Sequence, residues 1–488
     1  MKGDTHYDTI IIGAGLAGLA IALRLRQRGE KVIVIEKNSM VGGKMDAFEW
    51  KGFRFDKGPS LFTQPELIDE LFELSGKNPR EYINYNKVDE SCRYFFKNDR
   101  LDLHSNKELR KKSLSGKLSA SEINALEDYL QDVSASNEFI GDFFLSNPKP
   151  RLKDIFKRDL IIRYPEFLKL KFRTTLDKYN KRRFVSEKLV NIFNRFGTYN
   201  GSNPFKMSGL YSMISHLEIN DGTFFPTEGM RSIPESLYNL AVEQGVEFLF
   251  NASVKVNKSV NGFELNTSDK LNSNKLVCAI DHLTFYRDVL RDDSLFQKYI
   301  KQERSSSGVV FYWAMNEKFE ELGLHNIFFS ENYEKEFVEI FDNKKIPNDP
   351  TVYVHVSSIT NAKDAPVGKS NWFVMVNTPA NEHPSKENID ALRHKVISII
   401  ETRLKTEVFS KILNEEYWTS KDLEELTGSF GGALYGAASN RLNSALKRHD
   451  NYSKKINNLY FVGGSVHPGG GIPLVLRSAK IVEQLIYE

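Results

Sequence analysis

Cysteine is scarce in this chain, whose 488 residues include only Cys92 and Cys278. Two cysteines can form at most one bond, so the sequence excludes the framework of disulfides that stabilises many small secreted domains. Low cysteine usage of this kind is typical of a reducing compartment. We therefore expect a cytoplasmic protein.

Net charge is also nearly absent. Lysine and arginine total 67 and aspartate and glutamate total 64, which leaves a formal charge of +3. A balance this small gives no reason to expect nucleic acid as a partner, so any basic binding surface must be local. With 40% hydrophobic and 27% charged residues, the composition is globular, and the length predicts two or three domains.

Long apolar runs are missing as well. Residues 9–25 (TIIIGAGLAGLAIALRL) come closest, but they fall short of the roughly 20 apolar residues that a membrane-spanning helix needs. Three regularly spaced glycines interrupt them. We interpret this run as a buried strand followed by a helix, and no other segment predicts a transmembrane helix.

The glycines of this run form a nucleotide-binding pattern. Residues 8–12 predict a buried parallel strand, Gly13, Gly15 and Gly18 follow in G-x-G-x-x-G spacing, and Leu19–Arg28 predicts a helix. The first glycine permits a tight turn, the second lets the backbone approach a pyrophosphate, and the third lets helix and strand pack closely. The amino terminus of the helix would offer N–H groups and a positive dipole to phosphates.

An acidic residue completes this pattern. A second predicted strand, Lys31–Ile35, ends at Glu36, which is 23 residues after Gly13. A carboxylate at this place accepts hydrogen bonds from ribose hydroxyls and repels a 2′-phosphate, which argues against NADP. The pattern therefore predicts a dinucleotide.

A second glycine pair indicates which dinucleotide. Gly42 and Gly43 precede Lys44, and residues 55–60 (FDKGPS) follow shortly after. Flavoproteins of the glutathione-reductase-like superfamily use such a pair to pass backbone along the ribityl chain and the ring, so we expect FAD. Lys44 either places a charge near the phosphates or the flavin, or is a solvated surface lysine.

The far end of the chain repeats the arrangement of strand, glycines and helix. Residues 459–473 read LYFVGGSVHPGGGIP, with a predicted strand at Leu459–Val462 and a predicted helix at Leu474–Tyr487. Pro473 fits a first helical turn, where its missing N–H costs nothing. The N–H groups around Gly471 and Ile472 could bind the flavin pyrimidine edge and favour the anionic reduced ring.

The motifs GAGLAGL, GGK, FDKGPS, FFPTEGM, GGALYG and FVGGSVHPGGGIP occur in this order between residues 8 and 480. With them the chain resembles the bacterial carotenoid desaturases of the phytoene-desaturase type, within the flavin amine-oxidase-like superfamily. The segments HPGGGIP and GPSLFTQPE are more particular to carotenoid enzymes. FNRFGTYNGSNPF (193–205) and HLEINDGTFFP (216–226) are most similar to desaturases that introduce a 3,4 double bond near a 1-hydroxylated end.

The resemblance implies an α/β fold: a Rossmann-type FAD-binding domain of the glutathione-reductase-like kind, with an inserted α+β substrate domain. We expect residues 1–75, 226–285 and 425–488 in the first domain, and residues 76–225 and 286–424 in the second. Apolar runs at 305–316, 352–357 and 372–377 predict a mixed sheet in the substrate domain. The residues expected at the cofactor are Gly13, Gly15, Leu16, Ala17, Gly18, Glu36, Lys37, Gly42, Gly43, Lys44, Gly58, Pro59, Ser60, Val254, Gly463, Gly464, Gly471, Ile472 and Pro473.

The chemistry that the resemblance implies is dehydrogenation of a C–C bond in a long hydrophobic polyene, acyclic or derived from γ-carotene, in carotenoid biosynthesis. The flavin N5 would accept the hydride, and a base or water would take the proton, without need of a strong base. His216 and Glu218, placed on a short strand leading to residues 224–226, are the candidate catalytic residues. The alternative is that both belong to a structural hydrogen-bond network. No metal site is expected.

Rival functions remain open within this resemblance. A desaturase acting on phytoene, a redox-neutral carotene isomerase and a flavin amine oxidase are the rival enzymes. A non-catalytic prenyl-binding protein of the same fold, like the GDP-dissociation inhibitors, is the rival from another class. The final electron acceptor would be oxygen or a quinone.

A basic segment suggests a membrane surface as a partner. Residues 149–183 hold thirteen lysines and arginines against four acids, interleaved with aliphatic and aromatic residues. This mixture suits anionic headgroups above and acyl chains below. We expect this helical segment to bind the inner face of the cell membrane peripherally, with a basic solvated face on ordinary helices as the alternative.

Overall fold

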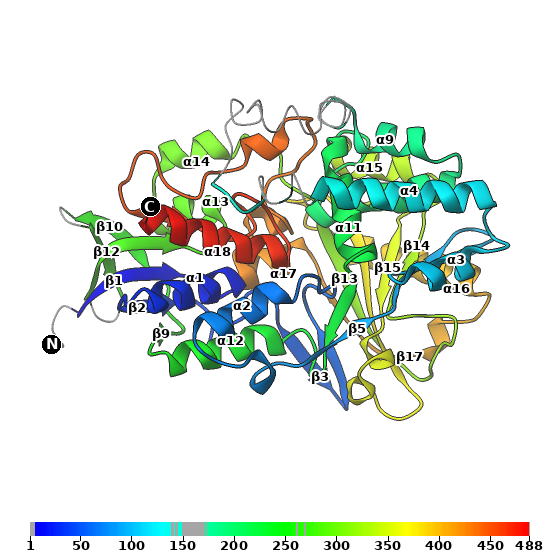
Figure 1. Cartoon of the computed structure of the whole chain (residues 1–488). Coiled ribbons are helices and arrows are strands. Elements are labelled where there is room, and N and C mark those ends of the chain that lie inside the picture. The colour runs from blue at the N-terminus through cyan, green and yellow to red at the C-terminus, as the bar shows by residue number, and fades with distance from the viewer. Residues whose placement is uncertain are drawn as a thin grey trace.

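Two seven-stranded sheets stand next to each other in the computed structural model, as Figure 1 shows. The structure describes residues 5–137, 141, 145–148, 171, 173–259, 262–267 and 270–487. Within these ranges, no helix combines the length and the hydropathy needed to cross a bilayer. The predicted membrane-binding segment 149–183 lies mostly outside the described residues.

The first sheet has a parallel core in the order β18-β12-β1-β2-β9. Its strands are β1 (Thr5–Ile12), β2 (Val32–Ile35), β9 (Glu247–Leu249), β12 (Lys270–Cys278) and β18 (Leu459–Phe461). A short antiparallel extension consists of β10 (Lys255–Ser259) and β11 (Gly262–Asn266), which pairs with the first half of β12. The parallel strands therefore come from three stretches that are far apart in the chain.

Both faces of this parallel core are covered, which explains the unbroken β-branched runs of β1 and β2. Ile11, Val32 and Val34 face one side, where they pack with helices from all three stretches. Figure 1 shows these helices gathered along the sheet. They are α1 (Leu16–Gln27), α2 (Glu66–Leu74), α12 (Ser232–Glu243) and α18 (Ile472–Tyr487). Ile10 and Ile33 face the other side, towards the helical turn Phe285–Val289 and α14 (Asp293–Tyr299).

The second sheet has the order β17-β13-β16-β15-β14-β6-β7. All neighbours are antiparallel except β14 and β6, so the sheet is mixed, as predicted. Its strands are β6 (Glu90–Phe95), β7 (Arg100–His104), β13 (Ser307–Met315), β14 (His325–Phe328), β15 (Val352–His355), β16 (Ser370–Thr378) and β17 (Ile412–Trp418).

The two faces of the second sheet pack against different parts of the chain. Alternate residues such as Trp372, Val374 and Val376 pack against α16 (Lys386–Leu404). Their neighbours Phe373 and Met375 point to the opposite face, because side chains alternate along a strand. Part of that opposite face borders a cavity, which is described below, and the rest packs against helical residues in a second apolar cluster.

Shorter elements connect the sheets and cover their ends. The strands are β3 (Ala47–Trp50), β4 (Phe53–Asp56), β5 (Tyr85–Val88) and β8 (Thr223–Pro226). The helices are α3 (Lys107–Leu114), α4 (Ala120–Ser136), α9 (Leu176–Arg183), α10 (Glu187–Arg195), α11 (Ile214–Ile219), α15 (Tyr333–Phe341) and α17 (Ser420–Thr427).

The predicted strand position of His216 and Glu218 is wrong, since both residues lie on the helix α11. The helical path begins earlier, where the side chain of Ser208 accepts a hydrogen bond from the backbone N–H of Leu210. A 3-10 turn over Gly209–Met213 then continues directly into α11. Such a capping serine starts a helix, and the extended chain begins only at β8.

Candidate functional site

One cavity of about 1040 Å³ is lined by residues of both sheets. Sites for small molecules usually measure about 300–1000 Å³, so this cavity has room for a large ligand or for two ligands in contact. One end lies at the carboxyl ends of β1, β12 and β18, where ligands bind in open parallel sheets. The other end lies at the face of the second sheet opposite α16.

The first end is a cradle of glycines with two different roles. Gly13 and Gly18 are required by the protein's own packing, because a Cβ at Gly18 would stand 1.9 Å from the Gly13 carbonyl oxygen. Gly15 and Gly471 instead keep the cavity open, since a Cβ there would meet no protein atom closer than 4.0 Å. The space that these two glycines leave empty is space for a ligand that touches backbone.

Two helices begin at this cradle. Gly15 is the N-cap of α1, so the helix starts at Leu16, three residues earlier than predicted. α18 starts at Ile472, and Pro473 lies in its first turn, as predicted. The N–H groups of a first turn have no partner within the helix and favour an anion in front of them.

Glu36 closes the cradle at the end of β2. Its carboxylate is buried and accepts hydrogen bonds from the backbone N–H of Ala14 at 2.7 Å and of Asn38 at 3.0 Å. Two carboxylate oxygens offer about four acceptor positions, so capacity for hydroxyl donors remains. Glu36 therefore both fixes the turn after β1 and faces the cavity.

Lys44 lies in the cavity wall, and its ammonium group donates to the backbone oxygen of Leu434 at 2.6 Å. Burial lowers the pKa of Lys44 to about 8, although the charge of Asp281 acts in the opposite direction. The positive charge of Arg304 lowers this pKa further. The alternative of a solvated surface lysine is therefore wrong.

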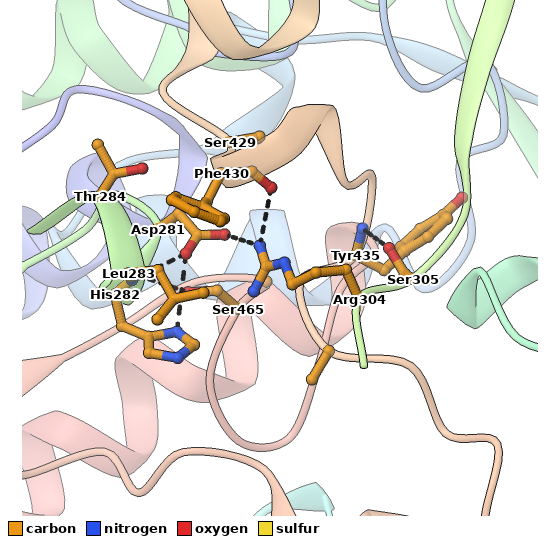
Figure 2. A network of polar contacts seen from close by, with 12 residues as sticks. Asp281, His282, Leu283, Thr284, Arg304, Ser305, Ser429, Phe430, Tyr435 and Ser465 are labelled. Carbon is orange, nitrogen blue, oxygen red and sulfur yellow. Dashed lines mark hydrogen bonds and ion pairs between the residues drawn. The ribbon is translucent and has the colours of Figure 1, made fainter. Parts of the chain in front are cut away.

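A buried polar network holds the segment 428–436 against the cradle, as Figure 2 shows. Asp281, which follows β12, forms an ion pair with Arg304, and both side chains are less than a tenth exposed. Arg304 also donates to the Phe430 carbonyl at 3.3 Å. On either side, Thr284 donates to the Gly428 carbonyl at 2.8 Å, and the Tyr435 N–H donates to the Ser305 hydroxyl at 3.0 Å.

The second end of the cavity is a chamber on the face of the second sheet opposite α16. The apolar side chains of Val310, Ile327, Phe373 and Met375 line it. They are alternate residues of β13, β14 and β16, which the pairing of the strands brings onto one face. Polar side chains stand among them at a few places, and these decide what the chamber can recognise.

Glu218 and Arg195 form a buried ion pair in the chamber wall. Arg195 donates to both carboxylate oxygens, at 3.1 and 3.2 Å. The hydroxyl of Tyr94 donates to the same carboxylate at 3.4 Å, and the hydroxyl of Tyr199 donates to it as well. Nearly all of the acceptor capacity of Glu218 is therefore used inside the protein.

His216 points elsewhere. Its Nδ1 lies 2.9 Å from the Asn220 amide nitrogen and its Nε2 lies 3.2 Å from an Asp221 oxygen. Among the described residues, His216 is not part of the cavity wall, whereas Glu218 is. The structure thus separates the two residues that the sequence suggested as a pair.

The predicted cofactor residues are brought together. All of them line the cavity except Gly18, which packs beneath it against Gly13. Asp281, Thr284 and Arg304 were not predicted as site residues, and residues 428–436 were predicted only as part of the FAD-binding stretch 425–488. Asp281 had a usable signal, since a polar residue directly after a buried parallel strand lies at the edge where ligands bind. Among the described residues, no group of three or more histidine, cysteine or acidic side chains could hold a metal ion.

Comparisons with known proteins agree with this geometry. The family model described as flavin containing amine oxidoreductase matches residues 16–484. The chain is 43% identical to a 1-hydroxycarotenoid 3,4-desaturase of Flavobacterium sp. (strain P99-3), over 98% of each protein. It is 30% identical to a 4,4'-diapolycopene oxygenase of Methylomonas sp, over 100% of this chain and 99% of that protein.

Solved structures are similar in fold. A putrescine oxidase bound to putrescine matches with a TM-score of 0.62 at 13% identity, over 99% of this chain and 100% of that one. A cyclohexylamine oxidase from Brevibacterium oxydans IH-35A matches with a TM-score of 0.61 at 15% identity, over 98% of each chain. Identities this low concern the fold alone.

Proposed function

We propose that this chain, which belongs to the family of flavin-containing amine oxidoreductases, uses FAD to desaturate a carotenoid. More sharply, we propose that it introduces a 3,4 double bond next to a 1-hydroxylated end in carotenoid biosynthesis. The observation that carries the proposal is the single cavity that joins a glycine cradle to an apolar chamber. The relative at 43% identity supports the finer substrate.

The cradle fits FAD, because it leaves open space where a dinucleotide must approach backbone, at Gly15 and Gly471. Bound FAD supplies an acceptor for a hydride. We assign its binding to residues 1–75, 226–285 and 425–488 and to the cofactor residues named from the sequence. The first turn of α1 would hold the pyrophosphate, Glu36 the ribose, and the first turn of α18 the flavin end, where its dipole favours negative charge.

The chamber suits a polyene. Apolar side chains from three strands exclude water, and each Å² of apolar surface removed from water contributes about 25 cal/mol to binding. We propose that residues 76–225 and 286–424 form this substrate domain. An allylic hydrogen is activated by the conjugated chain beside it, so the protein needs to position the reacting bond more than to supply a strong base.

The catalytic roles predicted for His216 and Glu218 stay predictions. Glu218 is favoured because it lines the cavity, but its carboxylate is already paired with Arg195. We propose that it acts mainly by fixing Arg195 and Tyr199 in the chamber wall. Turnover of Glu218→Gln within threefold of the unchanged protein would exclude a role as general base.

We also propose peripheral binding to anionic lipid on the inner face of the cell membrane, with oxygen or a quinone as the final electron acceptor. Of the basic segment 149–183, Lys171 is buried and Arg183 pairs with Asp132, so binding would depend on the other basic residues. Flotation with anionic and neutral liposomes tests this. Absence of binding to anionic liposomes at low salt would contradict it.

Expression in bacteria that accumulate defined carotenoids tests the main proposal. The hosts contain phytoene, lycopene, γ-carotene, or the 1-hydroxy derivatives of the last two, and chromatography with absorption spectra follows the products. One added conjugated double bond in a hydroxylated substrate alone is the expected result. Conversion of phytoene alone would move the chain to the phytoene desaturases. No conversion by a protein that holds FAD would favour an amine or another lipid as substrate.

A further inference from the structure

A buried histidine in the chamber wall has a ring nitrogen without a hydrogen-bond partner among the described residues. His325, the first residue of β14, is 3% exposed and lines the cavity. Its Nδ1 lies 2.7 Å from the Tyr353 hydroxyl, and that hydroxyl lies 2.7 Å from the hydroxyl of Ser60. Its Nε2 is buried and has no hydrogen-bond partner in the part of the chain that the structure describes.

The histidine is neutral in this position. Burial lowers its pKa well below the usual range, and the charges of His355 and Arg195 act in the same direction. A neutral imidazole has one N–H donor and one acceptor nitrogen. Whichever of them the Tyr353 hydroxyl uses, Nε2 keeps the other, and a buried group left in this state costs free energy until a ligand satisfies it.

The position of His325 in the cavity also limits what its Nε2 can bind. Ser60 ends the segment 58–60, which lines the cradle end of the cavity, so His325 stands where cradle and chamber meet. On its own strand the next residue facing the cavity is Ile327, and Phe373 and Met375 continue the apolar wall. A polar group placed in a largely apolar stretch of wall fixes the orientation of a ligand.

We infer that Nε2 of His325 binds the hydroxyl group of the substrate, with Tyr353 and Ser60 as positioning residues. This inference rests on the proposed function, in which a hydroxyl on C1 is two carbons away from the C3–C4 bond that is oxidised. The hydroxyl must therefore bind close to the cofactor. A hydroxyl both donates and accepts, so it satisfies Nε2 in either tautomer.

Two other cavity residues have a buried polar atom without a partner among the described residues. Arg195 has an unpartnered Nε, but its guanidinium is already held by Glu218 and Tyr199. Tyr333 is therefore the stronger competing candidate. Its hydroxyl is also buried, lines the cavity and has no partner among the described residues. However, Tyr333 comes after the opposite end of β14, and the strand from His325 to Phe328 alone spans about 10 Å. A group at that distance from the Ser60 end is too far from the cradle to hold an oxygen two carbons from the reacting bond.

Lycopene and 1-hydroxylycopene form a matched pair of probes for the FAD-loaded protein. Binding is measured by titration of the flavin fluorescence, and kcat/KM by chromatography of the products. For His325→Leu we expect the preference for 1-hydroxylycopene to fall at least about tenfold in both measurements, while lycopene changes less than threefold. His325→Gln, which keeps an amide donor and acceptor, should recover part of the preference.

Two control variants make this test specific. His355 is the cross-strand neighbour of His325, is equally buried and also has an unpartnered Nε2, but does not line the cavity among the described residues. His355→Leu should therefore leave the preference unchanged. Tyr333→Phe should leave it unchanged as well, and a loss of preference there instead of at His325 would overturn the inference.

The outcomes separate this inference from the proposed function. Equal losses for both polyenes in His325→Leu would indicate a structural role and overturn it. If the unchanged protein binds 1-hydroxylycopene no more tightly than lycopene, the inference also fails, whatever the activity. If neither polyene is converted but the binding preference depends on His325, the desaturation proposal fails while the hydroxyl site stands.

Discussion

One end of the cavity is formed mainly by backbone and the other mainly by side chains. The cradle consists largely of backbone. It includes the first turns of α1 and α18 and glycines at which a Cβ would either clash or occupy ligand space. The chamber consists of side chains that alternate along β13, β14, β15 and β16. A site made of backbone accepts whatever ligand has the right shape and charge. A site lined by side chains distinguishes ligands through those side chains, so substitutions there can change the substrate specificity while the cofactor stays the same.

Each end also contains one buried ion pair, and breaking these pairs should have the largest effects. Asp281→Asn leaves Arg304 without its partner at the cradle, and Glu218→Gln does the same to Arg195 in the chamber. We expect each variant to lose about 3–5 kcal/mol of unfolding free energy, because an uncompensated buried charge remains. Denaturant titration measures this, and Glu243→Gln, which breaks an exposed pair with Lys77, is expected to change the unfolding free energy far less.

The two variants should differ in what they bind. Asp281→Asn releases the segment 428–436 and should weaken FAD retention, whereas Glu218→Gln should keep FAD and weaken polyene binding. Equal loss of FAD from both would show that the two ends are not separable.

The second effect contrasts two glycines of the cradle. Gly18→Ala places a Cβ 1.9 Å from the Gly13 carbonyl oxygen, so helix and strand must move apart, at a cost of about 3 kcal/mol in stability. Gly15→Ala meets no protein atom closer than 4.0 Å and should leave stability unchanged within about 0.5 kcal/mol. It should nevertheless weaken FAD binding about tenfold or more, because its methyl group occupies ligand space. Thermal unfolding and FAD titration of both variants measure the contrast, and equal destabilisation would contradict it.

The third effect is a dependence on pH at the chamber end. Burial raises the pKa of Glu336 on α15 to about 7, although hydrogen bonds from Thr351 and Ser330 oppose the shift. Because the folded protein binds the proton more tightly than the unfolded chain, this residue's contribution is complete below the unfolded pKa of about 4.3 and is lost as pH rises towards 7. Between pH 5 and pH 8, the unfolding free energy of Glu336→Gln should fall by about 2 kcal/mol less than that of the unchanged protein. Unfolding free energies at pH 5 and pH 8 measure it, and equal slopes in both proteins would contradict it.

The smallest effect is a dependence on pH at the cradle end. Lys44 has its pKa lowered to about 8 by burial, so the folded state binds this proton less tightly than the unfolded chain does. Stability from this residue should therefore rise between about pH 8 and pH 10.4. FAD carries negative charge, so its affinity should fall about threefold as Lys44 loses its proton between pH 7 and pH 9. FAD titrations of Lys44→Met should be flat over the same range, and a matching fall in that variant would assign the effect to another group.

The difference between the two ends also explains what the sequence could predict. Gly13, Gly15, Glu36 and the strands around them follow from spacing within a short stretch, because the strand, turn and helix are local. The network of Asp281 and Arg304 was missed although Asp281 follows a readable strand, since its partner lies on another segment and the pairing is tertiary.

Three strands of the chamber wall were predicted from their apolar runs, but the residues that face the chamber were not. The wall needs the register of β14 against β6 and β15, which places Tyr94 opposite Ile327 and Ile327 opposite Tyr353. The strand assigned to His216 and Glu218 was wrong because Ser208, several residues upstream, starts a helical path that extended-looking residues then follow. Long-range pairing and a distant cap decided these positions, and neither is visible as a local pattern.

The alternation along β16 has a consequence for altering this protein. Phe373, Met375 and Asn377 contact the cavity, while Trp372 and Val374 belong to the core beneath α16. A combinatorial library confined to these odd-numbered positions would exchange part of the chamber wall while leaving the packing against α16 unchanged. These positions of β16 therefore allow variants that accept new lipid substrates to be selected while the contacts with α16 and the cofactor site stay unchanged.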